Sequence, residues 1–265
     1  MRMLQNYIIQ KKLYKDILLM THIVIGYPGI VECYKLVSEM QRTGVDLIEL
    51  QIPDDNAHLD GDLIREANTQ ALINGVTIEQ SFAFAAKLTA NFNIPFVFVV
   101  YYRTLIKFGC KEFFREAKNC NVQAIIIPDI PDCDLDRLYQ LAHSSGTSIV
   151  PVIFPGSSYS KFNSLLGYSM FCYCATHAGF TGEKASFDQS LLDYISSVKT
   201  SVTKPVAVGF GVRKKCHIEY LKNYADIAVV GSEVLKVLNK DGIDGAVKYL
   251  LELSEAFKFS SELVN

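Results

Sequence analysis

The sequence predicts one (β/α)8 barrel that spans residues 1–265 as a single domain. Eight short apolar runs alternate with longer amphipathic stretches, which is the repeat of a parallel barrel. Most of these runs are apolar on both faces, as a strand must be when it lies between a barrel interior and a layer of helices. The chain contains no linker-like segment, and single α/β barrels commonly reach about 250 residues.

The elements follow from this repeat in chain order. The amphipathic segment "MLQNYIIQKKLYKD" predicts an extra N-terminal helix that closes the bottom of the barrel. The eight strands are predicted at residues 17–26, 47–53, 95–102, 124–130, 148–154, 170–176, 205–210 and 226–231. Helical spacing is clearest in "EQSFAFAAKLTANF", "KEFFREAKN", "LDRLYQLAHS" and "IDGAVKYLLELSEAF". An open doubly wound sheet is the alternative, and it is less favoured because no GxGxxG motif follows the first strand.

Composition excludes several classes of protein. The formal net charge is -2, so the chain lacks the basic surface that nucleic acid requires. We expect no signal peptide and no membrane span, because no run of about 18 uncharged apolar residues is present, and we expect a cytoplasmic protein. The seven cysteines form no CxxC pair, which indicates reduced thiols and no zinc site.

Two carboxylates mark the predicted active site, which lies at the C-terminal ends of barrel strands. Glu49 is interior to the second strand, between Ile48 and Leu50. A carboxylate that faces an apolar barrel mouth suits proton transfer, although a Glu49 that faces outward would serve only an ion pair. Asp60 follows in the next loop, where an aspartate before a glycine is also a common turn residue.

Glycine-containing turns on the opposite rim predict a phosphate site. The segments "GFTG" (179–182), "GFG" (209–211) and "GS" (231–232) end three consecutive strands. Glycines let backbone N–H groups approach an anion, and the helix after Gly231 would present its positive N-terminal end. Together with the two carboxylates, this favours acid/base chemistry on a small phosphorylated molecule, and nothing in the pattern requires a metal.

Taken in order and spacing, several segments resemble the tryptophan synthase alpha chain family (indole-3-glycerol-phosphate aldolase). They are "GVDLIELQIP", "DG" at 60–61, "VVYY", "AIIIPDIP", "YCATHAGFTG", "PVAVGFGV" and "ADIAVVGS". The resemblance implies a lyase of tryptophan biosynthesis that cleaves indole-3-glycerol phosphate to indole and glyceraldehyde 3-phosphate. It implies no cofactor in this chain, with pyridoxal phosphate expected only in a beta-chain partner.

The resemblance also assigns roles to residues. Glu49 matches the acid/base that protonates the indole C3 carbon and takes the proton of the glycerol hydroxyl. Asp60 matches the group that stabilises the indole N–H, and Tyr173 matches a tyrosine near the catalytic glutamate. The matching phosphate-binding positions are Gly182, Gly211, Gly231 and Ser232, and the pocket positions are Tyr101, Tyr102, Thr181 and Phe210.

The loop at residues 54–62, "DDNAHLDGD", departs from the family's pattern. Asn56 replaces the aspartate that touches the beta partner, and Gln51, just before this loop, replaces a small glycine and is expected to narrow the barrel mouth. We expect the added charge of Asp54 and Asp55 to form a solvated loop face. The hypothesis is a retained site whose loop closure, or pairing with a beta chain, differs from that of typical members.

Two other functions remain open from the sequence. One is a regulatory subunit that binds a phosphorylated ligand with little turnover of its own. The other is a related barrel lyase that acts on a different phosphorylated substrate, as the altered pocket rim suggests.

Overall fold

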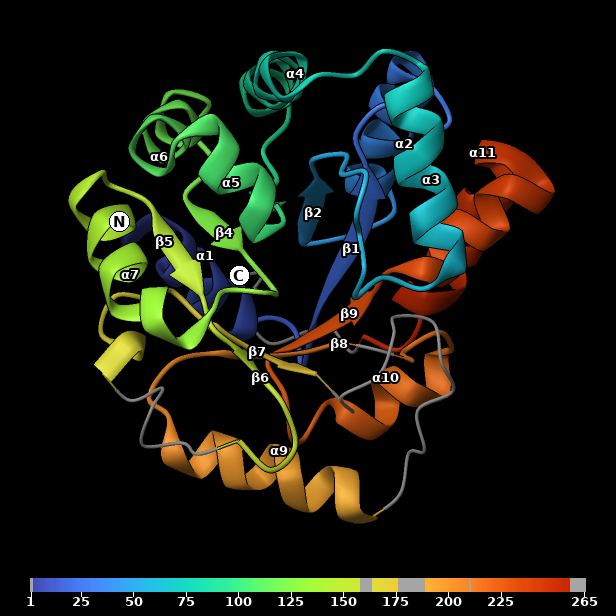
Figure 1. Ribbon diagram of the computed structural model, residues 1–265. Helices are drawn as coiled ribbons and strands as arrows, with labels where there is room; N and C mark the ends of the chain where they lie inside the picture. The colour runs from blue at the N-terminus through green and yellow to red at the C-terminus, as the bar shows by residue number, and fades with distance from the viewer. Residues whose placement is uncertain (1, 158–163, 176–188, 210, 258–265) are drawn as a thin grey trace.

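The strands of the computed structural model, which describes residues 2–157, 164–175, 189–209 and 211–257, form one parallel sheet. Its strand order is β5-β4-β3-β2-β1-β9-β8-β7-β6. Figure 1 shows these strands at the centre of the molecule, with helices around them. The strands are β1 (Leu18–Val24), β2 (Leu47–Gln51), β3 (Phe96–Val99), β4 (Ala124–Ile126), β5 (Ser148–Val150), β6 (Val152–Ile153), β7 (Cys172–Ala175), β8 (Val206–Gly209) and β9 (Ile227–Val230).

The two edge strands of the sheet, β5 and β6, are joined through Pro151 alone. Proline has no N–H to donate to a ladder, so the fifth predicted strand is interrupted at this residue. Its first part pairs with β4 and its second part pairs with β7. The sheet is therefore a nearly closed barrel of the eight predicted strands. This order confirms the (β/α)8 class and excludes the open doubly wound alternative.

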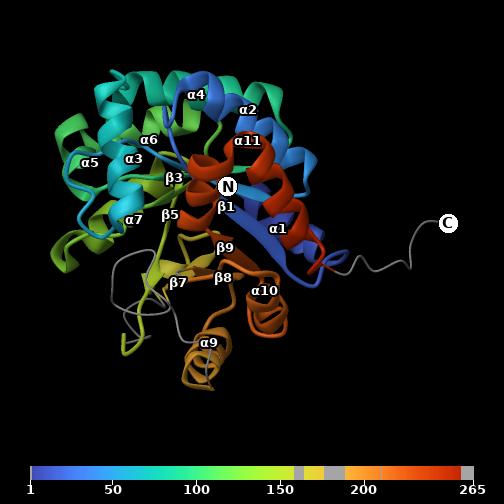
Figure 2. The same ribbon diagram turned by 90° about the vertical axis from the view of Figure 1, so that its right-hand side faces the viewer.

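Helices surround the barrel, as Figures 1 and 2 show. The predicted amphipathic stretches are confirmed as helices, and α4 begins with a capping box in which Thr77 and Gln80 bond each other's backbone N–H. The described helices are α1 (Arg2–Lys12), α2 (Ile30–Arg42), α3 (Asp62–Ile73), α4 (Ile78–Asn91), α5 (Tyr102–Phe108), α6 (Cys110–Asn119), the 3-10 turn η1 (Asp132–Asp134), α7 (Leu135–Ser144), α9 (Gln189–Ser201), α10 (Lys215–Leu221) and α11 (Ser232–Ser254).

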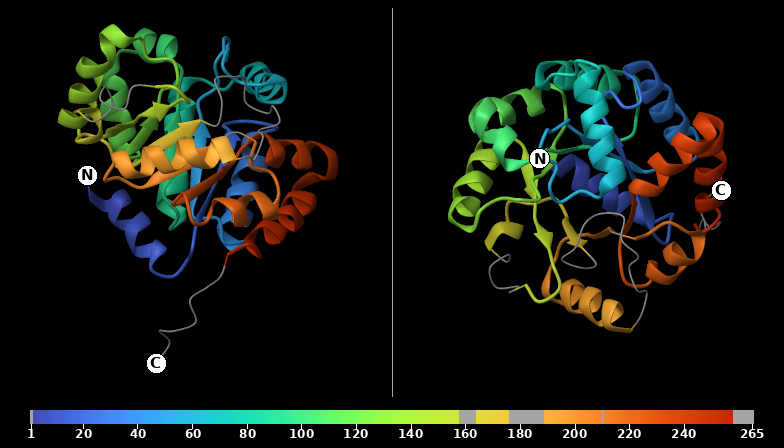
Figure 3. Two further views of the ribbon diagram at one scale, coloured as in Figure 1. Left: turned by 90° about the horizontal axis from the view of Figure 1, so that it is seen from below. Right: turned by 45° about the vertical axis from the view of Figure 1, so that its right-hand side comes forward.

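The interior of the barrel is filled by alternate residues of the strands. In β1, Leu18 and Met20 belong to this interior cluster, whereas Leu19 and Ile23 pack in the outer layer against helices. Leu4 and Ile8 of α1 join the interior cluster. The predicted N-terminal helix thus closes one end of the barrel, and the left view of Figure 3 shows this dark-blue helix near the lower ends of the strands.

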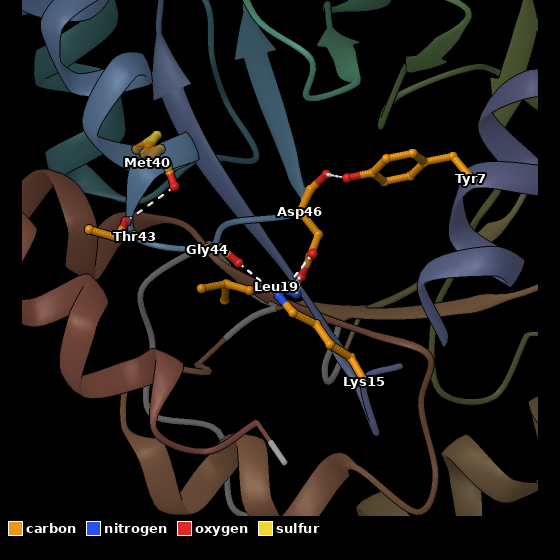
Figure 4. A network of polar contacts seen from close by, with 7 residues as sticks. All are labelled: Tyr7, Lys15, Leu19, Met40, Thr43, Gly44 and Asp46. Carbon is orange, nitrogen blue, oxygen red and sulfur yellow. Dashed lines mark hydrogen bonds and ion pairs between the residues drawn. The ribbon is translucent and has the colours of Figure 1, made fainter. Parts of the chain in front are cut away.

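A buried ion pair fixes the same end of the barrel (Figure 4). Lys15 Nζ lies 2.8 Å from Asp46 Oδ2 and 2.9 Å from the carbonyl oxygen of Gly44. Asp46 Oδ2 also accepts a hydrogen bond from the N–H of Leu19, at 3.0 Å. The Tyr7 hydroxyl donates to the Asp46 carbonyl oxygen at 3.1 Å. This network joins α1, the start of β1 and the turn before β2, at the end of the barrel opposite the strand C-termini.

Candidate active site

A cavity of about 580 Å³ opens where the C-terminal ends of the strands meet. This is the end at which barrel enzymes place their chemistry. It collects polar side chains from β1, β2, the loop after β2, β7 and the start of α11. Its lining residues are His22, Glu49, His58, Leu59, Asp60, Ile64, Val99, Tyr101, Ile126, Pro128, Asp129, Ile130, Val152, Phe154, Tyr173, Gly211, Val212, Val229, Gly231 and Ser232.

Glu49 faces the barrel interior and lines this cavity, so the alternative of an outward ion pair is wrong. It is 4% exposed and lies beside His22, its register partner on β1. Glu49 Oε2 is 3.0 Å from His22 Nδ1. Glu49 Oε1 is buried and has no hydrogen-bond partner among the described residues. The carboxylate therefore has one oxygen held by the protein and one oxygen left for another group.

Asp60 is held by two buried side chains. Gln51 Nε2 donates to Asp60 Oδ2 at 2.7 Å, and the Tyr101 hydroxyl also hydrogen-bonds the Asp60 carboxylate. Burial first, and the charge of Asp60 second, raise the pKa of Tyr101 far above its ordinary value. Tyr101 thus stays a neutral donor. Asp60 is not only a turn residue, because it lines the cavity together with Glu49.

Tyr173 reaches the cavity from β7. Burial, followed by the charges of Glu49 and Asp60, raises the pKa of its hydroxyl well above 10.0, so Tyr173 is a neutral side chain near both carboxylates. Its ring leaves no room for a side chain on the next strand. A Cβ on Gly209 would lie 1.8 Å from the Tyr173 hydroxyl oxygen, and the glycine is required for this close approach.

The predicted phosphate positions fall in two groups. Gly211, Gly231 and Ser232 line the same cavity as the carboxylates. Gly231 immediately precedes α11, so the N–H groups of the first turn of that helix lie at the cavity rim. Gly182, Thr181 and Phe210 lie outside the described residues.

The two predicted pocket tyrosines separate. Tyr101 lines the cavity, where His58 stacks on it with ring centroids 5.3 Å apart. Tyr102 is not among the described lining residues, because it begins α5 and its hydroxyl donates to Asp134. Asp129 takes a place in the wall instead, where it accepts a hydrogen bond from the Tyr102 N–H at 2.7 Å.

The loop of residues 54–62 is tied to α5 through its first two carboxylates. Asp54 is 4% exposed, accepts from Asn56 N–H at 2.7 Å and accepts from Thr104 Oγ1 at 2.5 Å. Asp55 is exposed and pairs with Arg103. The expected solvated face is therefore wrong for Asp54. Its carboxylate is a buried acceptor that organises the loop.

Sequence reasoning missed four cavity residues or contacts: His22, His58, Asp129 and the bond from Gln51 to Asp60. His22 carried a signal, because it continues the alternation of Leu18 and Met20 on the inward face of its strand. His58 and Asp129 depend on loop conformations, which no periodicity reports.

The described residues contain no cluster of three or more His, Cys, Asp or Glu side chains able to hold a metal ion. Within the same ranges, no helix has the length and apolar character needed to cross a bilayer. The seven cysteines, all in described positions, are free thiols.

Comparison with known proteins gives one consistent family. The profile of the tryptophan synthase alpha chain matches residues 9–261. The tryptophan synthase alpha chain of Desulforapulum autotrophicum is 36% identical over 253 residues, which cover 95% of this chain and 100% of the relative. That of Syntrophotalea carbinolica is also 36% identical, over 252 residues that cover 95% of this chain and 100% of the relative.

Solved structures agree in fold. A mutant tryptophan synthase alpha subunit from Pyrococcus furiosus has a TM-score of 0.81 at 25% identity, covering 91% of this chain and 98% of that one. Tryptophan synthase from Mycobacterium tuberculosis has a TM-score of 0.86 at 22% identity, covering 96% and 97% of the two chains. The chain belongs to the tryptophan synthase alpha chain family, the lyases of tryptophan biosynthesis that cleave indole-3-glycerol phosphate.

Proposed function

We propose that Glu49 is the acid/base of this cleavage, that Asp60 stabilises the indole N–H, and that Gly211, Gly231 and Ser232 bind the phosphate of the substrate. One observation carries the proposal: both carboxylates and all three phosphate positions line a single cavity of about 580 Å³. A cavity of this volume is in the range that encloses a small-molecule ligand.

The reaction needs a proton to enter and a proton to leave. Protonation of indole C3 ends the aromaticity of the pyrrole ring and places positive charge on the ring nitrogen. Glu49 supplies this proton, and the carboxylate of Asp60 stabilises the cation. Glu49 then takes the proton of the glycerol hydroxyl as the carbonyl forms and the bond from C3 to the side-chain carbon breaks. The electron pair of that bond returns to the ring and restores indole.

Tyr173 and Tyr101 contribute as neutral side chains. The pKa of each hydroxyl is raised, so neither carries a charge that would compete with the carboxylates. Tyr101 donates to Asp60, which orients that anion before substrate binds. We assign Tyr173 to the pocket wall between Glu49 and Asp60, where its ring excludes water from the reacting atoms.

The phosphate anchor positions the reacting carbon. The first turn of α11 offers backbone N–H groups and a positive helix end to an anion. When the phosphate of the substrate binds at this rim, the indole ring is held in place against Glu49 and Asp60.

The altered loop at residues 54–62 affects how this chain is expected to bind a beta chain. The alpha chain of this family carries no cofactor, and pyridoxal phosphate belongs to the beta chain. We infer that this chain also associates with a beta chain, through a loop whose shape is set by Asp54 and Thr104 rather than by the family's usual residues. The test is to mix this chain with a beta chain from the same source. If the two chains activate each other as strongly as typical members do, the idea that the altered loop changes their coupling is wrong.

Glu49→Gln tests the acid/base assignment. The substitution should abolish formation of indole and glyceraldehyde 3-phosphate from indole-3-glycerol phosphate, because an amide neither gives nor takes the required proton. The affinity for glycerol 3-phosphate, measured by calorimetry, should change little because the phosphate site is separate. The matched control is Glu219→Gln on the exposed face of α10.

Three results would redirect the assignment. Turnover retained by Glu49→Gln would remove Glu49 from the mechanism. Phosphate-ligand binding by the unaltered protein without product, with a beta chain present, would favour the regulatory-subunit function. Cleavage of another phosphorylated compound in preference to indole-3-glycerol phosphate would favour the different-substrate lyase.

A further inference from the structure

His22 is the one histidine on β1, and it lies directly beside Glu49. The two residues are paired in the parallel register of β1 and β2, and both are buried. Their side chains meet at 3.0 Å, from His22 Nδ1 to Glu49 Oε2. An ionised carboxylate can only accept a hydrogen bond, so Nδ1 carries the proton in this contact. The proposed acid/base residue therefore has a fixed donor on one of its two oxygens.

This contact makes the two oxygens of Glu49 unequal. Oε2 is engaged by His22, whereas Oε1 has no partner among the described residues. A carboxylate without such a donor could present either oxygen, because the terminal torsion of Glu is broad. A donor on Oε2 fixes that torsion and leaves Oε1 as the atom able to carry a proton.

We propose that His22 is a positioning residue for Glu49: it holds Oε2 through its Nδ1–H, so that Oε1 both gives the proton to substrate and takes the next one back. This inference rests on the proposed acid/base role of Glu49. It adds a residue from a different strand to the site and names the oxygen that does the chemistry.

The protons balance if Oε1 of Glu49 both gives and takes them. In the first step the O–H bond at Oε1 breaks and a C–H bond forms at indole C3, which leaves Glu49 as a carboxylate that His22 stabilises by its hydrogen bond. In the second step the glycerol O–H bond breaks and its proton returns to Oε1. The proton on His22 Nδ1 stays where it is throughout. No oxidant, reductant or other reactant is needed.

The surroundings of His22 support a donor at this position. Burial lowers the pKa of the His22 imidazole, but the hydrogen bond and charge of Glu49, with the charge of Asp60, outweigh burial and raise it above 6.5. Among the described residues, the uncharged Gln51 of β2 also raises this pKa, Tyr173 from β7 is neutral, and Gly231 beyond β9, which has no side chain, lies beside His22. Within the described part of the chain, the charged groups that act on His22 are the carboxylates of Glu49 and Asp60.

The test compares variants of the intact protein with and without a donor at the Nδ1 position. His22→Phe keeps a planar ring and removes the donor, whereas His22→Asn places an amide N–H close to where Nδ1 lies. We expect His22→Phe to lower kcat for indole-3-glycerol phosphate by about 10²-fold with little change in KM, because a misplaced acid/base costs about this much. His22→Asn should recover most of that loss.

Wild-type protein and Glu49→Gln are assayed alongside. If the wild-type protein turns over substrate and Glu49→Gln does not, the proposed function is established. The His22 variants then test only the inference about His22. An unchanged kcat in His22→Phe would overturn the inference about His22. Equal losses of kcat in His22→Phe and His22→Asn would also overturn it, because they would mean that packing and not the hydrogen-bond donor matters. Melting temperatures report folding, and His22→Leu replaces His22→Phe if the phenylalanine variant does not fold.

Discussion

Asp60 and Glu49 differ at the residue scale in how far the protein engages each carboxylate. Gln51 and Tyr101 both donate to Asp60, so this anion is oriented before any ligand arrives. Glu49 keeps one oxygen without a described partner. A preorganised anion suits stabilisation of a developing cation, and a partly engaged carboxylate suits proton transfer. The contacts therefore support the two proposed roles, in addition to the positions of the residues.

The His22–Glu49 contact predicts a pH dependence of stability. The folded pKa of His22 is raised above its ordinary value of 6.5, so the contribution of its charged form is fully present below the unfolded pKa and is lost as pH rises through the folded pKa. The difference in free energy of unfolding between wild type and His22→Phe should therefore shrink as pH rises above about 6.5.

Urea denaturation of both proteins at pH values below and above 6.5 gives the difference directly. The matched control replaces the exposed His143 of α7 by phenylalanine. A wild-type-minus-variant difference for His22 that grew with pH would contradict the raised pKa.

At the same scale, the sequence predicts that both carboxylates and the described phosphate positions meet, but not which bonds they form. Glu49, Asp60, Gly231 and Ser232 come together because the C-terminal ends of parallel strands share one end of a barrel. The bonds from His22 to Glu49 and from Gln51 to Asp60 depend on strand register and on the path of the loop. Neither is encoded in a local pattern of residue types.

At the element scale, all eight strands and the N-terminal helix are predictable from periodicity. A short apolar run between two amphipathic helical stretches is rarely anything other than a buried strand. The interruption of the fifth strand at Pro151 and the break within α11 are set by single residues instead. In α11 the backbone of Gly242 has φ 68° and ψ -166°, outside the helical region. Only glycine adopts this conformation readily.

Gly242→Ala should therefore lower the free energy of unfolding by about 1–3 kcal/mol. A Cβ at this position would meet no atom within 4 Å, so the cost is one of backbone conformation and not of packing. Thermal or urea unfolding measures it, with Lys248→Ala on the exposed face of the same helix as control. An unchanged or increased stability would mean that the break straightens without cost.

On the scale of the whole molecule, a buried network that stabilises the fold and the proposed active site lie at opposite ends of the barrel. The Lys15–Asp46 pair lies at the end of the barrel opposite the cavity, with side chains only 6% and 3% exposed. Removing one member of a buried ion pair leaves the other charge uncompensated. This network should matter for folding and should leave turnover by the folded protein alone.

Lys15→Met should lower the free energy of unfolding by about 3–5 kcal/mol while kcat per folded molecule stays within the error of the assay. The matched control is Lys240→Met, whose lysine side chain is 79% exposed. A fall in kcat equal to that of a Glu49 variant would show that the two ends of the barrel are coupled.

The break at Pro151 divides the barrel into two sets of strands, β1 to β5 and β6 to β9. Among the described strands, these sets share a backbone ladder only between β1 and β9. Glu49 lies on β2 and Asp60 in the loop after it, in the first set, whereas Gly211, Gly231 and Ser232 follow β8 and β9 of the second set. A substrate that contacts the proposed acid/base residue and the proposed phosphate-binding residues at once would act as a non-covalent cross-link between the two halves. Ligand binding should then suppress amide hydrogen exchange most strongly in β5 and β6, beside the interrupted strand.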